Sequence, residues 1–201
     1  MVVISSIKQI SPDCVQVTLS AGSCFFIRLS YLRYVPHDKI DVGIELSDVD
    51  LEDITASGFA YSAEKAALLY LNRSEHSRFL LTQKLKRKGH EKQAIEQALD
   101  YLESCDYLSD SRYAEAWLRN RFINHAEGKQ KLLVELCSRG IERKLAEEKI
   151  SDFLDSVGED KILSRAVEKC KRLGKSDLDI EKYLQRKGFS ISQIRNYLQS
   201  N

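Results

Sequence analysis

Proline is nearly absent from this sequence: Pro12 and Pro36 are its two prolines, and none follows residue 36. Proline interrupts helices, because its ring removes an N–H donor and clashes with the preceding turn. From about residue 57 the chain is instead dominated by alanine, leucine, glutamate, lysine and arginine, which favour helix. The composition therefore predicts a mainly helical protein.

Long apolar runs and patterned cysteines are missing as well. No segment approaches the roughly 20 apolar residues that cross a bilayer. The five cysteines have no CxxC spacing, their number is odd, and no secretory signal stands at the N-terminus. We therefore expect reduced thiols and a soluble, cytoplasmic protein without a membrane partner.

Motifs for catalysis and metal binding are also lacking. The four histidines lie far apart in sequence and none falls in an HExxH frame. The chain contains no GxxxxGK[ST], GxGxxG or GxSxG segment. We expect no metal, no cofactor and no enzymatic activity.

The first 55 residues differ from the rest and predict a small β-rich module, residues 1–55. Three segments rich in valine, isoleucine, phenylalanine and threonine, residues 2–10, 14–20 and 24–30, are separated by turn signals. An irregular acidic stretch, residues 44–54, follows and is expected to end in a helical turn. Residues 1–60 have a charge balance of −4, whereas residues 61–201 have a balance of +5. This asymmetry suits the larger part to a polyanion or an acidic partner.

One frame occurs three times in the larger part. "LKRKGHEKQAI" returns as "LCSRGIERKLA" and "LQRKGFSISQI", so that Gly89, Gly140 and Gly188 align, with Lys or Arg directly before each glycine. Leucines four residues before each glycine and apolar residues six and ten after it place one helix on each side. A basic last turn followed by glycine is a favourable helix end. The frame is thus a helix stop followed by a helix start.

A further apolar pattern precedes each pair of helices, at about residues 62–73, 110–124 and 159–173. The chain is therefore expected to contain three tandem three-helix repeats, residues 56–106, 107–156 and 157–201. Repeats that bury their apolar stripes against one another form an elongated, curved array.

Basic residues cluster in all three repeats. On a curved array they can follow a phosphate backbone or an acidic protein groove. Lysine and arginine are also ordinary helix formers, so each residue alone has a structural explanation; the recurrence favours binding. Tyr113, Trp117 and Phe122 have helical spacing typical of a core rather than of base-stacking platforms, so sequence-specific base readout is not indicated. The candidate partner-binding and DNA-binding residues are Arg73, Arg78, Lys84, Arg87, Lys88, Arg112, Arg119, Arg121, Lys129 and Lys131.

These segments resemble the RecX family of regulatory proteins, which act on the RecA recombinase. The resemblance rests on the helix ending in Lys88–Gly89, on "YLSDSRYAEAWLRNR" and on "GKQKLLVELCSRGI". It covers about residues 60–201 and is strongest in 80–150. Three positions depart from the family pattern: Leu80 replaces the usual glutamate, Ser109 replaces an acid and His90 replaces an aromatic.

The resemblance implies a protein that binds RecA filaments on single-stranded DNA and whose basic residues can reach that DNA and acidic protein patches; direct contact with the DNA stays open. It implies inhibition or modulation of ATP hydrolysis, strand exchange and filament growth, in DNA repair, recombination and the SOS response. A monomer is expected. Reversing the charges of Arg119 and Arg121 together should then abolish filament binding and leave the helical signal unchanged. A stand-alone electrostatic nucleic-acid-binding module and a plain protein scaffold are the alternatives.

Overall fold

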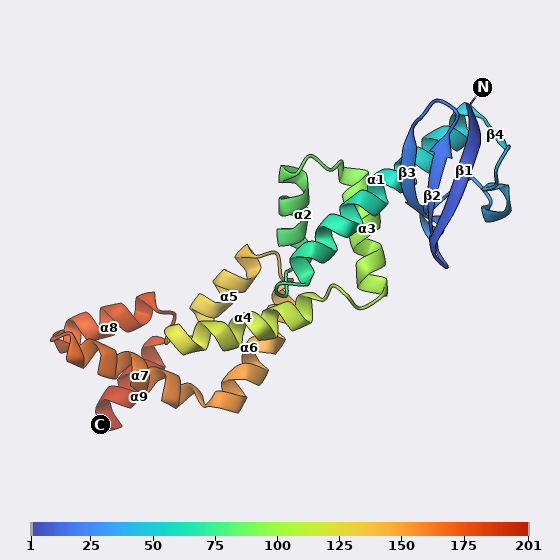
Figure 1. Cartoon of the computed structure of the whole chain (residues 1–201). Coiled ribbons are helices and arrows are strands. Elements are labelled where there is room, and N and C mark those ends of the chain that lie inside the picture. The colour runs from blue at the N-terminus through green and yellow to red at the C-terminus, as the bar shows by residue number, and fades with distance from the viewer. Residues whose placement is uncertain (1, 201) are drawn as a thin grey trace. The chain divides into compact units, whose positions relative to one another are not determined.

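The computed structural model describes residues 2–200, in which an antiparallel sheet is followed by helices (Figure 1). The sheet has the order β3-β2-β1-β4. Its strands are β1 (Val2–Ser11), β2 (Cys14–Leu19), β3 (Cys24–Arg28) and the two-residue β4 (Glu45–Leu46). The three expected strands are confirmed, and β4 is an addition that the acidic composition around it did not indicate.

Alternation along β2 places its apolar residues on one face. Val15, Val17 and Leu19 are buried, whereas Gln16 and Thr18 between them are partly exposed. Because successive side chains of a strand point to opposite faces, this pattern gives the sheet one apolar side. That side forms a core with residues of the helix that follows the sheet, such as Ile54.

Nine helices follow within the described residues, and their bounds confirm the mainly helical class with three-helix groups. They are α1 (Asp48–Leu71), α2 (Arg78–Arg87), α3 (Lys92–Ser104), α4 (Asp110–Asn124), α5 (Lys129–Ser138), α6 (Arg143–Val157), α7 (Glu159–Arg172), α8 (Asp177–Arg186) and α9 (Ile191–Ser200).

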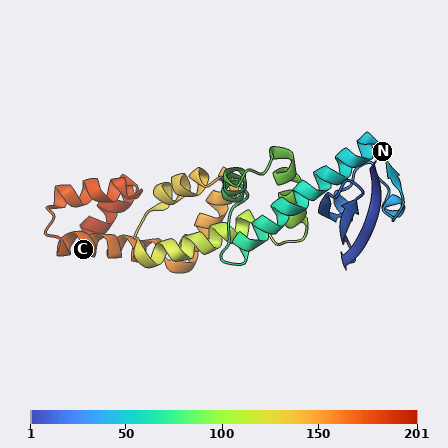
Figure 2. The same ribbon diagram turned by 45° about the horizontal axis from the view of Figure 1, so that its top comes forward.

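The first helix begins much earlier than the sequence pattern suggested. α1 starts at Asp48 because Ser47 and Asp50 form a capping box: the Ser47 hydroxyl accepts from the Asp50 amide (3.2 Å), and the Asp50 carboxylate accepts from the Ser47 amide (3.0 Å). The expected helix at about residues 62–73 is confirmed, but its expected start and the expectation of an irregular stretch at 44–54 were wrong. The expected boundary after residue 55 falls inside α1, which runs unbroken from the strands to α3 (Figure 2).

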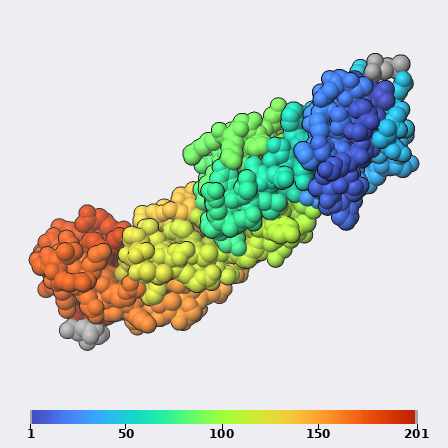
Figure 3. Space-filling view, viewed as in Figure 1, coloured from blue at the N-terminus to red at the C-terminus, as the bar shows by residue number. Residues whose placement is uncertain are grey.

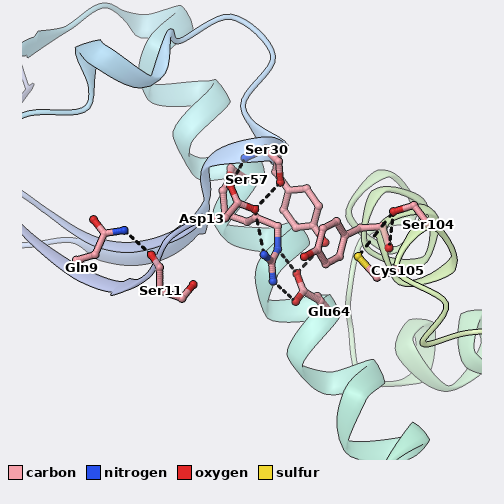
Figure 4. Close-up of polar contacts among 11 residues, drawn as sticks. Gln9, Ser11, Asp13, Ser30, Ser57, Glu64, Ser104 and Cys105 are labelled. Atoms are coloured by element: carbon pink, nitrogen blue, oxygen red, sulfur yellow. Dashed lines mark hydrogen bonds and ion pairs between the residues drawn. The ribbon is translucent and has the colours of Figure 1, made fainter.

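A buried charge cluster joins the strands to α1 (Figure 4). The Arg28 guanidinium, at the end of β3, donates to both Glu64 oxygens (2.8 and 2.5 Å) and to Asp13 (3.1 Å), and the Tyr31 hydroxyl also donates to Glu64 (2.8 Å). Burial opposes the arginine charge, but these bonds more than offset it and raise the pKa of Arg28. The strands and α1 accordingly form one continuous surface (Figure 3).

Each repeated glycine ends a helix with the same hydrogen bonds. Gly89, Gly140 and Gly188 have φ values of +87°, +83° and +88°. The amide of the following residue donates to the carbonyl of the leucine four before the glycine, at 3.2 Å in all three cases. This is the Schellman motif, which satisfies carbonyls at a helix end. The expected helix stop and helix start are confirmed at all three places.

The chain divides into two compact units. The first contains the residues up to Ser74 together with Leu81–Leu108, and the second contains Glu75–Leu80 together with the residues from Ser109 onward. Each has its own core; Leu81, Leu99 and Leu102 are central in the first, and Leu118, Leu136 and Ile150 in the second. Within residues 2–200 no helix is long and apolar enough to span a membrane.

Candidate interaction surface

The ten candidate basic residues are distributed between the two units. The first unit contains Arg73, Lys84, Arg87 and Lys88; the second contains Arg78, Arg112, Arg119, Arg121, Lys129 and Lys131. The candidates therefore form two groups, one in each compact unit.

In the first unit, Lys84 of α2 and Lys88, which directly follows α2, share one aromatic neighbour. The Nζ atoms of Lys84 and Lys88 lie 4.6 and 5.0 Å from the ring centroid of Tyr70, at the end of α1. The four-residue spacing on a helix puts both ammonium groups on one face, and the ring attracts both cations. Arg73 and Arg87 are exposed. The structure thus brings together a small basic face around the end of α2.

In the second unit, Arg121 binds a buried acid. Its Nε and Nη2 atoms lie 2.7 and 3.1 Å from the carboxylate of Glu127, whose side chain is 1% exposed, and the Nζ of Lys187 lies 3.2 Å from the same carboxylate. Burial would raise the pKa of Glu127, but the hydrogen bonds from the two cations outweigh it and lower that pKa. Arg121 therefore has a structural task, because removing one partner of a buried pair costs about 3–5 kcal/mol.

Other candidates in this unit also have partners within the protein. The Nε of Arg112 lies 3.0 Å from Glu75, and the Nζ of Lys131 lies 3.0 Å from Glu135. The backbone amide of Arg78 donates to Asp110 (2.8 Å), and burial nevertheless raises the pKa of this carboxyl. Partly exposed pairs contribute little to stability, so Arg112 and Lys131 can exchange them for an external anion at small cost.

Arg119 and Lys129 are exposed in the second unit. Arg119 lines a shallow groove between α4 and α6, whose floor includes Leu118 and Phe153. An ion pair between Glu115 and Lys149, 2.9 Å apart, lies along the same groove. An apolar floor beside an arginine can accept a side chain of a protein partner.

The aromatic residues of α4 belong to the core, as their spacing predicted. Tyr113 is buried, and Trp117 and Phe122 are partly buried against the same core. The Trp117 ring is covered by the guanidinium of Arg139, 4.9 Å from its centroid. Arg139 was not among the candidates, although its position directly before a repeated glycine was a visible signal.

These observations define a class: a helical repeat protein with a small N-terminal sheet and basic side chains distributed over its repeats. Within residues 2–200, no three histidine, cysteine, aspartate or glutamate side chains gather as a metal site would require.

Comparison with known proteins identifies the family. Residues 63–102 match the model described as RecX, first three-helix domain, and residues 109–150 match RecX, second three-helix domain. The regulatory protein RecX of Treponema pallidum (strain Nichols) is 36% identical over 138 residues, which cover 69% of this chain and 84% of the relative. That of Halorhodospira halophila is 29% identical over 147 residues, which cover 70% of this chain and 88% of the relative. The chain belongs to the RecX family of regulatory proteins, as the sequence motifs predicted.

Two solved structures share the fold. A crystal structure of regulatory protein RecX aligns with a TM-score of 0.78 at 19% identity and covers 100% of both chains. The crystal structure of RecX from Lactobacillus salivarius aligns with a TM-score of 0.62 at 23% identity, covering 71% of this chain and 96% of the other. The first alignment includes the N-terminal sheet, which lies outside the residues that the sequence resemblance covers.

Proposed function

We propose that this protein binds the filament that the RecA recombinase forms on single-stranded DNA and restrains it. The restrained activities are ATP hydrolysis, strand exchange and filament growth, in the cytoplasm, during DNA repair and recombination. Membership of the RecX family is the observation that carries the proposal. The protein would act as a monomer and without catalysis, because a ligand that prefers one state of the filament shifts the filament toward that state.

The contacts that we propose fall into two groups. The exposed cations reach the partner directly, while the paired ones add to the local positive potential and hold the helices in place. Direct contacts with acidic protein patches or with DNA in the filament are proposed for Arg73, Arg87, Lys88, Arg119 and Lys129. Supporting roles are proposed for Arg78, Lys84, Arg112, Arg121 and Lys131.

The ATPase rate of RecA on preassembled single-stranded DNA filaments tests the proposal. Titration of this protein should slow the rate at substoichiometric amounts, and an excess of free DNA should not restore it. Restoration by free DNA would instead identify a general nucleic-acid binder that only sequesters strands. An unchanged rate at all ratios, with no binding, would reject the proposal.

A pair of matched variants tests the contacts. The double reversal Arg119→Glu and Lys129→Glu replaces two exposed cations, and we expect at least a tenfold loss of affinity for the filament. Lys92→Glu with Lys144→Glu is the control, because it changes the charge equally at two exposed residues in first helical turns. Arg121 is left intact, since its reversal would leave the buried Glu127 without this partner; the double reversal of Arg119 and Arg121 expected from the sequence would therefore also destabilise the fold. Equal affinities of the two double variants would contradict the assignment.

A further inference from the structure

The start of α5 rests on a turn of the third repeat, in a contact made by the backbone. The Gly128 amide donates to the Lys187 carbonyl (2.8 Å), and the Gln130 amide donates to the Gly188 carbonyl (3.2 Å). A Cβ atom on Gly128 would lie 2.5 Å from the Gly188 oxygen, and one on Gly188 would overlap with Lys131. The two glycines therefore permit this close approach.

The start of α2 makes the equivalent contact with a turn of the second repeat. The Ser77 hydroxyl donates to the Arg139 carbonyl (2.7 Å), and a Cβ on Gly140 would overlap with the Phe79 side chain. Ser77 and Gly128 both stand twelve residues before the glycine of their own repeat. The same rule holds twice: the start of the second helix of one repeat sits on the basic residue–glycine turn of the next repeat.

The equivalent turn of the first repeat, Lys88–Gly89, has no such neighbour among residues 2–200. Lys88 and Gly89 are exposed, and nothing lies within 4 Å of the position of a Cβ on Gly89. The backbone of this turn nevertheless has the same Schellman geometry as the two occupied turns. The Lys88–Gly89 turn thus has the geometry of the two turns that receive a helix start, but it receives none from the described residues.

We propose that the Lys88–Gly89 turn receives the N-terminal end of a helix of the RecA filament, an inference that rests on the proposed function above. The internal contacts define the chemistry of that helix. Its first residue is a serine or a glycine, which donates to the Lys88 carbonyl as Ser77 and Gly128 donate to theirs. A carboxylate stands directly before it, as in the contact with the third repeat, where Glu127 meets Lys187; in the contact with the second repeat, His76 holds this place before Ser77. The basic residues Lys86, Arg87 and Lys88 complement this charge.

A second copy of this chain does not fit the turn as well. The corresponding helix start of the third repeat is Ser176, which is preceded by Lys175. Lys175 would place a cation against Lys88, where Glu127 provides an anion in the internal contact. The Ser176 hydroxyl also already donates its hydrogen to the Asp179 carboxylate (2.7 Å). Like charge and an occupied donor both act against head-to-tail self-association.

The experiment uses Gly89→Asn, with Gly174→Asn as its matched control. Asparagine tolerates positive φ better than most residues; Gly174 has a φ of +67° at the end of α7 and also has open space at its Cβ position. Binding of each full-length, fluorescently labelled variant to preassembled RecA filaments on single-stranded DNA is measured by anisotropy. Circular dichroism verifies that both variants fold.

We expect Gly89→Asn to weaken binding at least tenfold and Gly174→Asn to leave it within twofold of the wild type. Equal affinities for both variants, or equal losses, would overturn the docking turn while leaving the proposed function intact. A wild-type protein that does not bind filaments would overturn the proposed function and the inference together. Self-association of the wild type that Gly89→Asn abolishes would assign the turn to a second copy instead, against the proposal.

Discussion

Buried carboxylates at three places in the chain are each held by several donors. Asp53 accepts from the backbone amides of Arg33, Tyr34 and Val35 at 2.8–3.1 Å and so anchors the loop after β3. Glu64 accepts from Arg28 and Tyr31, and Glu127 accepts from two cations. A buried charge persists only when such bonds replace its hydration. These acids are therefore structural.

Glu127→Gln should destabilise the protein by about 2 kcal/mol at pH 7, because Arg121 and Lys187 lose the charge that they neutralise. The pKa of Glu127 is depressed by folding, so its stabilisation is fully present above its unfolded value of about 4.3 and is lost as the pH falls through the folded pKa. The free energies of unfolding of wild type and variant should therefore converge below pH 4. Urea denaturation at pH 7 and at pH 3 measures both differences; an equal gap at the two pH values would contradict the assignment.

At the scale of elements, helix caps explain two departures from the family pattern. Ser109 caps α4 by accepting from the Arg112 amide (3.3 Å) without help from an acid. Because the third residue of α2 is Leu80, its side chain offers no acceptor for the hydrogen of the Ser77 hydroxyl. The hydroxyl accepts from the Leu80 amide and donates its hydrogen to the Arg139 carbonyl instead. At Ser176, Asp179 accepts the hydroxyl hydrogen (2.7 Å), and the Asp179 amide donates to the same hydroxyl (3.3 Å). The residue three positions after the cap thus decides whether the cap can also bind a neighbouring turn.

Glycine-to-alanine substitutions at the repeated turns should differ in cost. Gly89→Ala introduces only the strain of positive φ, about 1–2 kcal/mol, because its Cβ meets open space. Gly140→Ala should cost about 2 kcal/mol more, since its Cβ overlaps with Phe79 and forces the helix start of α2 away. Thermal unfolding followed by circular dichroism checks the order; equal melting temperatures would show that the turn and α2 do not touch in solution.

At the scale of the whole molecule, the sheet, α1, α3 and the part of α2 from Leu81 onward belong to one unit. α1 is buried by the sheet near its start and by α3 near its end. The Gln97 side chain of α3 also donates to the carbonyl of Tyr31 (2.8 Å), in the segment after β3. The N-terminal segment is therefore part of the scaffold that positions α2 and its basic face.

Arg28→Met should test this continuity in the full-length chain. It leaves Glu64 buried without its cation, and we expect a loss of about 3–4 kcal/mol in the first unit. Hydrogen exchange should show reduced protection in α1, α3 and the strands, whereas α4 to α9 should remain protected, because their core lies in the second unit. Uniform loss across both units would contradict independent cores.

The sequence by itself determined the helical class, the three strands, the helix ends at Gly89, Gly140 and Gly188 and the family. Each of these depends on local chemistry. Side-chain alternation, a glycine that can adopt a left-handed backbone conformation and the spacing of a motif can each be recognised within about fifteen residues. The start of α1 was missed because its first turns carry Asp50 and Asp53, which read as a solvated loop. Only the fold showed that Asp50 caps the helix and that Asp53 binds a distant loop.

The tertiary structure alone decided which basic residues already have partners. Arg119 and Arg121 lie two residues apart and look equivalent in sequence, yet Arg119 is exposed and Arg121 binds Glu127. Their difference depends on Lys187, sixty residues after Glu127, and on the close packing of Gly128 against Gly188. Charge can be counted along a chain, but the pairing of charges depends on contacts between residues that are distant in sequence, and only folding makes those contacts.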